Sequence, residues 1–229
     1  MSVGTQTIAA VSKTYMLPIQ LCAGYPLQRI LARQILLTGF LCLFCLSVGA
    51  QSHYFPKGAF SSDTPEDRFV SNWYSKDLTA LKEPSLFALR KTQSHDSYRF
   101  VWLRTFHHPV AIRVDLTADG TGTLTTKIAS GAGGYQPGVL TVNKTRQLTS
   151  DEIHSILTQV AESNFWSLST TWEEDRRGED GSEWIFEGVR RNQYHVVTRW
   201  APKEGPIHQI GLLFLLTLAQ LDVPKKEFY

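Results

Sequence analysis

The segment Val110–Ile128 reads VAIRVDLTADGTGTLTTKI and predicts a β-hairpin. In its first half, apolar residues alternate with Arg113 and Asp115, which is the two-residue period of a strand with one buried face. Ala118-Asp119-Gly120 interrupts this alternation with residue types that favour a turn. The alternation resumes after the turn, so we expect two antiparallel strands joined by a short connection.

Four further strands are predicted outside this hairpin. Tyr98–Phe106 precedes it, and Val139–Leu148 follows it after a glycine-rich connection, SGAGGYQPG, at Ser130–Gly138. Glu183–Trp200 reads as a second hairpin that turns around Arg191-Asn192.

A two-residue turn in this second hairpin would fix its register. Three residues of the first strand would then lie opposite three of the second: Gly188 opposite His195, Phe186 opposite Val197, and Trp184 opposite Arg199. The same register would bring the Arg199 guanidinium near an indole face, where a cation–π contact can form.

Helical patterns fill the rest of the domain. Residues 51–95 are expected to form a lead-in with short helices, interrupted at Pro84. Thr149-Ser150-Asp151-Glu152 has the T-x-x-E form of a capping box, and it opens a helix that ends at Asn164. Pro206 starts a last helix that is apolar nearly all round its middle. The inward stripe of the capped helix is expected to consist of Ile153, Ile156, Leu157 and Val160.

The order of elements predicts the fold class. Helices come first, followed by four strands, a helix, two strands and a last helix. Strands that are neighbours in sequence are joined by short turns, which favours antiparallel pairing. We therefore expect an α+β domain over residues 96–223, with a mostly antiparallel sheet of about six strands and helices packed on one face.

Residues 1–50 have the features of a secretory signal peptide. Ile35–Ala50 contains no charged residue, Arg29 and Arg33 precede it, and Val48-Gly49-Ala50 closes it with small side chains. Cleavage is therefore expected after Ala50.

Two further expectations concern this segment. Met16 is the expected start of translation, because a signal that begins there has ordinary proportions. An uncleaved anchor at residues 35–50 is the alternative to cleavage, although the run is shorter than the roughly 20 residues of a membrane-spanning helix. The domain would then be exported and periplasmic or secreted in the first case, and tethered to the membrane by this segment in the second.

Charge and cysteine content exclude some classes of function. The chain has 23 Lys and Arg and 21 Asp and Glu, and residues 1–50 hold three of these cations and none of the acids. The remaining part is nearly neutral and lacks the excess of basic residues that nucleic-acid binders need, so no nucleic-acid partner is expected. All three cysteines also lie in residues 1–50, which leaves the domain without a disulfide or a cysteine nucleophile.

No catalytic motif is present, and we predict no catalytic, metal-binding or cofactor-binding residue. The patterns HExxH, GxSxG and GxxxxGK[ST] are all missing from the sequence. His107 and His108 are adjacent on an extended segment, so they could bind one metal only if Pro109 kinked the chain. Glu187 faces away from His195 in the register above, beyond the reach that an acid–base pair needs.

Three polar segments are interpreted as structural. Ser130–Gly138 lacks the helix N-terminus of a phosphate site and reads as a connection between strands. Asp115 and Asp119 lack the other ligands of a calcium loop and read as part of a turn. Glu173–Glu183 is charged and contains two glycines, so it reads as an exposed loop.

The run Asp180–Pro202, DGSEWIFEGVRRNQYHVVTRWAP, resembles a segment of uncharacterised exported proteins of bacteria. In those proteins a D-G-x-x-W-x-x-E-G-V strand is followed by Y-H-V-V-x-R-W-x-P, and the likeness extends over Tyr98–Leu221. The resemblance implies an envelope or secreted setting in a bacterium. It implies no reaction, no cofactor and no site residues.

Two hypotheses of function remain open. The first is a non-enzymatic domain of the cell envelope that binds an envelope protein or another surface ligand. Aromatic residues in expected loops support it, because such residues often mark contact surfaces: Tyr54, Phe55, Tyr135 and Trp172. The alternative is a hydrolase or metal-dependent enzyme whose site is gathered from separate strands: His107, His108, Asp180, Glu187 and His195.

Overall fold

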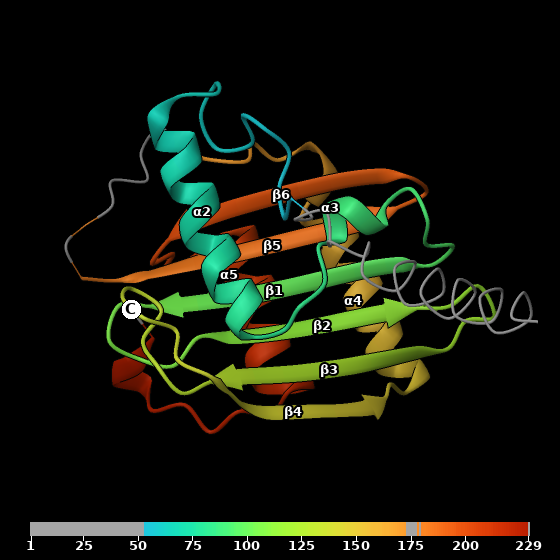
Figure 1. Cartoon of the computed structure of the whole chain (residues 1–229). Coiled ribbons are helices and arrows are strands. Elements are labelled where there is room, and N and C mark those ends of the chain that lie inside the picture. Colours follow the sequence, from blue (N-terminus) through green and yellow to red (C-terminus); the bar gives the residue numbers. More distant parts are fainter. Residues whose placement is uncertain (1–52, 173–177, 179, 229) are drawn as a thin grey trace, which may run out of the picture. The chain divides into compact units, whose positions relative to one another are not determined.

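An antiparallel sheet with the strand order β4-β3-β2-β1-β5-β6 organises the described part of the chain (Figure 1). The structure is a computed structural model that describes residues 53–172, 178 and 180–228. It confirms the predicted α+β fold with its six-stranded antiparallel sheet. The strands are β1 (Asp96–Arg104), β2 (Val110–Leu116), β3 (Gly122–Ala129), β4 (Leu140–Gln147), β5 (Ser182–Arg190) and β6 (Gln193–Trp200).

Both predicted hairpins form. β2 and β3 make the first, and they pair from Val110 with Ile128 to Leu116 with Gly122. β5 and β6 make the second, in the register expected from a two-residue turn. Arg191 and Asn192 occupy that turn with φ angles of 48° and 67°. Two consecutive positive φ angles are the geometry of a type I′ turn, which matches the right-handed twist of the strands that it joins.

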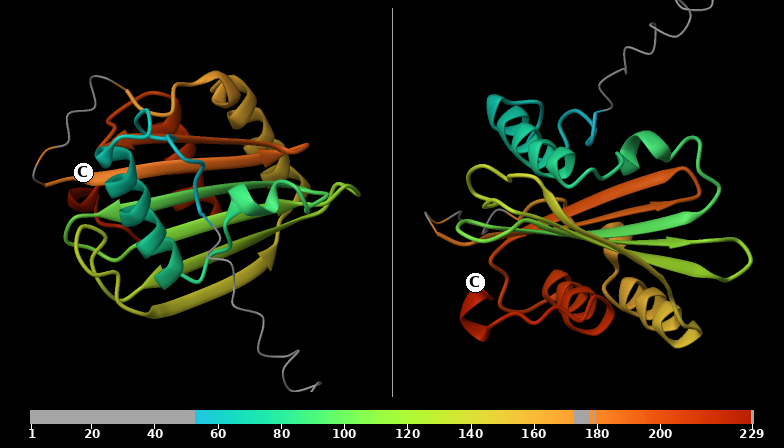
Figure 2. Two further views of the ribbon diagram at one scale, coloured as in Figure 1. Left: turned by 45° about the horizontal axis from the view of Figure 1, so that its top comes forward. Right: turned by 60° about the horizontal axis from the view of Figure 1, so that its bottom comes forward.

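Helices cover both faces of the sheet, so the expectation of helices on one face is wrong (Figure 2, right). α2 (Pro65–Ala80) and α3 (Leu86–Leu89) lie on one face, and α4 (Ser150–Glu162) and α5 (Pro206–Leu212) lie on the other. β1 is buried on both faces. Its run Phe100-Val101-Trp102-Leu103 is apolar without interruption, which is typical of a strand between two layers.

The first core lies between the sheet and α4, α5 and the π-helical turn Leu213–Leu218. The capping box of α4 forms as predicted, because Thr149 and Glu152 each accept a hydrogen bond from the other's backbone N–H. Leu157 was expected to face inward and is 43% exposed, because only one side of α4 touches the sheet. Aromatic side chains dominate this core: Tyr98, Phe100, Trp102, Phe165, Trp184, Phe186 and Phe214.

The second core lies beneath α2, which makes residues 53–95 an integral layer of the fold. α2 is a single helix of 16 residues, with Thr64 as its N-cap and Pro65 in its first turn. Asp67 is buried and accepts hydrogen bonds from the backbone N–H groups of Gly58 and Phe60, at 3.0 and 2.8 Å. The segment before α2 is thereby fixed to it, and its Phe55 and Phe60 are buried among the core residues Val70, Tyr74, Leu78 and Leu81.

The expectations for residues 1–50, including cleavage after Ala50 and a start at Met16, concern a segment outside the described residues. Within the described part, no helix combines the length and the apolar character that crossing a membrane requires.

Asp77 is an exception among the polar residues of the second core. Its side chain is fully buried, and neither carboxylate oxygen has a hydrogen-bond partner among the described residues. Burial raises the pKa of Asp77 from 3.8 to about 7, and the neighbouring Lys76 lowers it in part. The protonated form is therefore the one that the folded protein accommodates.

This raised pKa predicts a pH dependence of stability. Below pH 3.8 the carboxyl is protonated in the folded and unfolded states, and it has no effect on their difference. As the pH rises from there to about 7, only the unfolded state ionises freely, so the free energy of unfolding falls and then levels off. We expect Asp77→Asn to remove this fall, so that its stability gain over the natural chain grows by about 2–3 kcal/mol between pH 5 and pH 8.

The measurement is urea unfolding of both proteins at the two pH values. Glu66→Gln, which changes an exposed acid on the same helix, is the matched control and should follow the natural chain. A gain from Asp77→Asn that is equal at both pH values would contradict the assignment.

Candidate functional site

The structure separates the histidines and acids of the enzymatic alternative. His107 Nε2 lies 3.7 Å from Glu227 Oε2, whereas His108 Nδ1 lies 2.8 Å from the carbonyl oxygen of Gly131. Asp180 lies in an exposed bend before β5. Among the residues that the structure describes, no three His, Cys, Asp or Glu side chains gather in a way that could hold a metal.

Glu187 and His195 lie on opposite faces of the sheet, as the predicted register requires. His195 Nε2 is 2.9 Å from the carbonyl oxygen of Leu168, and its ring packs against Phe165. Burial lowers the pKa of His195, although the contact with the Leu168 carbonyl raises it in part. The neutral imidazole therefore belongs to the wall of the first core.

Glu187 belongs to a buried network of charges on the other face. It accepts hydrogen bonds from Arg99 at 2.8 Å (Nε) and 2.5 Å (Nη2), and from Tyr194 Oη at 2.8 Å. Arg99 is completely buried, and its Nη1 also donates to the carbonyl oxygen of Pro84 at 2.7 Å. Such saturation by fixed partners gives Glu187 a structural role.

Glu83 extends this network across three strands. Its carboxylate lies 3.3 Å from Arg99 of β1, 3.0 Å from Arg113 of β2 and 2.9 Å from Lys127 of β3. Burial alone would raise the pKa of Glu83, but these three cations hold it below the usual value. The connection between α2 and α3 is thereby attached to the sheet by charge.

The loop Ser130–Gly138 joins β3 to β4, as the sequence predicted. Its N–H groups from Ser130 to Tyr135 all donate to backbone carbonyl oxygens, so they are not available to a phosphate. Gly133 and Gly134 lie flat against the end of β1, where a Cβ atom would come within 2.8 Å of the Cα atoms of Leu103 and Thr105. The loop is therefore pinned to the sheet.

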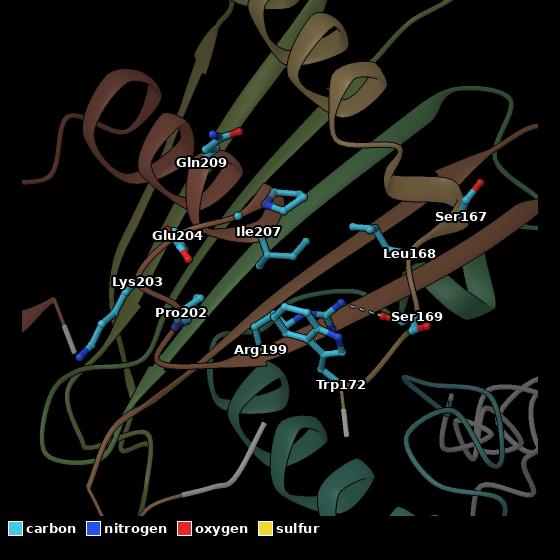
Figure 3. A pocket seen from close by; sticks show the side chains of 12 residues that line it. Ser167, Leu168, Ser169, Trp172, Arg199, Pro202, Lys203, Glu204, Ile207 and Gln209 are labelled. Atoms are coloured by element: carbon cyan, nitrogen blue, oxygen red, sulfur yellow. Dashed lines mark hydrogen bonds between the residues drawn. The ribbon is translucent and has the colours of Figure 1, made fainter. Parts of the chain in front are cut away.

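A cavity of about 820 Å³ lies between β6, the segment Ser167–Trp172 and the start of α5 (Figure 3). Arg199 crosses it and donates to the carbonyl oxygens of Ser169 and Thr170, at 3.1 and 3.2 Å. Its guanidinium carbon lies 5.4 Å from the ring of Trp172. The expected cation–π contact therefore forms with Trp172, not with Trp184, which lies in the first core. These contacts attach the segment before β5 to the edge of β6.

A second cavity, of about 570 Å³, lies between α2, the glycine-rich loop and the end of β6. We call it the aromatic groove. Four aromatic residues line it, together with polar side chains and two glycines: Phe69, Asn72, Trp73, Lys76, Thr105, Gly134, Tyr135, Gly178 and Trp200.

Two hydrogen bonds hold the walls of the aromatic groove together. Trp73 Nε1 donates to the carbonyl oxygen of Gly133 at 2.7 Å, and the Lys76 ammonium donates to the carbonyl oxygen of Tyr135. Trp200 closes one end, where its ring lies so close to Gly181 that a Cβ atom there would be 2.4 Å away. Helix, loop and strand end thus form one fixed surface.

The aromatic groove exposes large apolar side chains. Phe69 is 68% exposed and Tyr135 is 58% exposed. Phe106 lies beside the groove, 6.0 Å from the Tyr135 ring, and is 56% exposed. Aromatic rings gathered on a surface in this way mark contact sites more often than scattered ones do.

Of the loop aromatics suggested by the sequence, Tyr135 and Trp172 are exposed, and Phe55 is buried. Tyr54 is partly buried and donates to the carbonyl oxygen of Glu83. Phe69 and Trp73 lie in residues 51–95, where the sequence predicts short helices but no contact surface. Their spacing of four residues could have shown a second apolar stripe on α2, beside the stripe Val70-Tyr74 that faces the core.

The role of Glu187 yields a prediction. Glu187→Gln removes one of the two carboxylates that pair with the fully buried Arg99, and breaking a buried pair at one side costs about 3–5 kcal/mol of stability. Glu204→Gln, at an exposed position, is the control and should stay within about 0.5 kcal/mol of the natural chain. Guanidinium unfolding measures the free energy of unfolding of both variants. An equally small change for Glu187→Gln would show that the contact between Arg99 and Glu187 does not hold α2 and α3 on the sheet.

Comparisons of the chain with protein-family models and with curated proteins find no match. The aromatic groove therefore stands as a candidate on its own geometry. It combines exposed rings, an ammonium group and fixed walls in a cavity of the size that ligand sites have, about 300–1,000 Å³.

Proposed function

We propose that this chain is an exported domain of the bacterial cell envelope that binds a surface ligand without catalysis, through the aromatic groove. The observation that carries this proposal is the gathering of exposed aromatic side chains on walls that are fixed by Trp73 and Lys76. Burial of exposed rings against a partner stabilises the complex by about 25 cal/mol for each Å² of apolar surface removed from water.

Two features of the sequence support the proposed export and the proposed bacterial envelope. The charged flank, the apolar run and the small residues before Gln51 support export, and the resemblance of Asp180–Pro202 supports a bacterial envelope. The ligand would then be a component of the envelope itself. A membrane contact of the domain would be needed only if residues 35–50 stay attached.

The proposal predicts that envelope binding depends on the groove. We expect the double variant Phe69→Ala/Tyr135→Ala to lose retention on cell-envelope fragments, because both rings contribute exposed surface to the groove. Both side chains are more than half exposed, so the free energy of unfolding should change by no more than about 0.5 kcal/mol for each substitution. The measurement is cosedimentation of the protein, purified from cells that express the full chain, with envelope fragments.

Trp172→Ala is the matched control, since Trp172 is 59% exposed but lines the other cavity. Its retention should equal that of the natural chain. Full retention of the double variant would overturn the proposed role of the groove, and loss of retention by Trp172→Ala alone would assign binding to the cavity around Arg199.

A further inference from the structure

We infer that the ligand of the aromatic groove is a carbohydrate of neutral or negative charge. The inference rests on the proposed function and names the class of its ligand. Sugar rings have one face of C–H groups and an edge of hydroxyls, so they can cover an aromatic ring and keep their polar edge in water. Phe69 and Tyr135 present exposed rings of this kind, and Trp73 and Trp200 add partly buried ones.

The backbone around the groove argues against a peptide. An extended peptide binds best where a free strand edge can pair with its N–H and C=O groups. The N–H groups of Thr105, Gly134 and Tyr135 all donate to carbonyl oxygens within the fold, at 2.9, 3.3 and 3.0 Å. The Thr105 hydroxyl is also used, because it donates to Gly181 O and accepts from Gly181 N. A peptide in the groove would thus gain no strand pairing from these groups.

The ammonium of Lys76 bears on the charge of the ligand. Lys76 lines the groove, and its ammonium favours a ligand of neutral or negative charge. An ammonium group has three donors, and the carbonyl oxygen of Tyr135 occupies one of them. The other two can serve a hydroxyl or a carboxylate, whereas a cationic ligand would meet a like charge.

Polar groups lie next to the rings in an order that suits a sugar. Asn72 is adjacent to Trp73 on α2, and Lys76 lies one turn further along the same helix. Side-chain amide and ammonium groups beside aromatic faces can bind the hydroxyls at the edge of a ring that stacks on those faces. The cavity of about 570 Å³ is large enough for more than one sugar unit of a chain.

The test distinguishes a failure of the carbohydrate assignment from a failure of the proposed function. Envelope fragments are divided into an untreated portion and a portion from which boiling detergent, protease and organic solvent have removed protein and lipid. We expect the natural chain to bind both portions, and Phe69→Ala/Tyr135→Ala to bind neither. Trp172→Ala should bind like the natural chain on each.

Each other outcome has a distinct meaning. Binding to untreated fragments that is lost from the stripped polysaccharide, and is absent in the double variant, would overturn the carbohydrate and leave the proposed function with a protein or lipid ligand. Equal binding of the natural chain and the double variant to both portions would overturn the groove as the site, and with it both proposals.

A competition experiment with two defined oligosaccharides tests the charge of the ligand independently. The probes are tetra-N-acetylchitotetraose, which is neutral, and its deacetylated form, which has the same backbone and, in the mildly acidic buffer of this measurement (about pH 5), four ammonium groups. On the polysaccharide that the protein retains, the neutral probe should compete better than the cationic one by roughly tenfold, the ratio that about 1.4 kcal/mol produces. Lys76→Gln should reduce that preference, and a stronger competition by the cationic probe would overturn the sign assigned to the ligand.

Discussion

The packing of residues 53–95 against the sheet depends on one constraint, the buried contact between Arg99 and the carboxylates of Glu187 and Glu83. A guanidinium without water needs charge and hydrogen bonds from the protein, and these carboxylates supply both. Since Glu83 lies just after α2, its position under three cations fixes the end of that helix on the sheet. The outer face of α2, with Trp73 and Lys76, is thereby held opposite the glycine-rich loop.

Local patterns predicted much of the fold. The alternation in Val110–Ile128, the capping box at Thr149 and the turn at Arg191-Asn192 act over a few residues, and each determines its own geometry. The packing of residues 53–95 on the sheet could not be predicted in the same way. Arg99 and Glu187 have the period of solvent-facing positions in their strands, and only their mutual contact, across 88 residues of sequence, allows them to be buried.

Local patterns could not predict the candidate site either. Tyr135 was suggested by its place in a glycine-rich loop, but the groove needs α2 and the end of β6 as well. The bond between Trp73 and Gly133 spans 60 residues, so no local pattern contains it. The histidines attracted attention by their residue type, and the structure gives His195 a neighbour in the core and His108 a carbonyl partner.

The way in which the glycine-rich loop is pinned has a consequence for the energetics of recognition. A surface loop usually loses conformational entropy when a ligand orders it, and this loss reduces affinity. Here the N–H groups from Ser130 to Tyr135 are already bonded, and Gly133 and Gly134 already touch β1. This wall of the groove is thus preorganised, so a ligand that contacts the loop loses little binding free energy to ordering it.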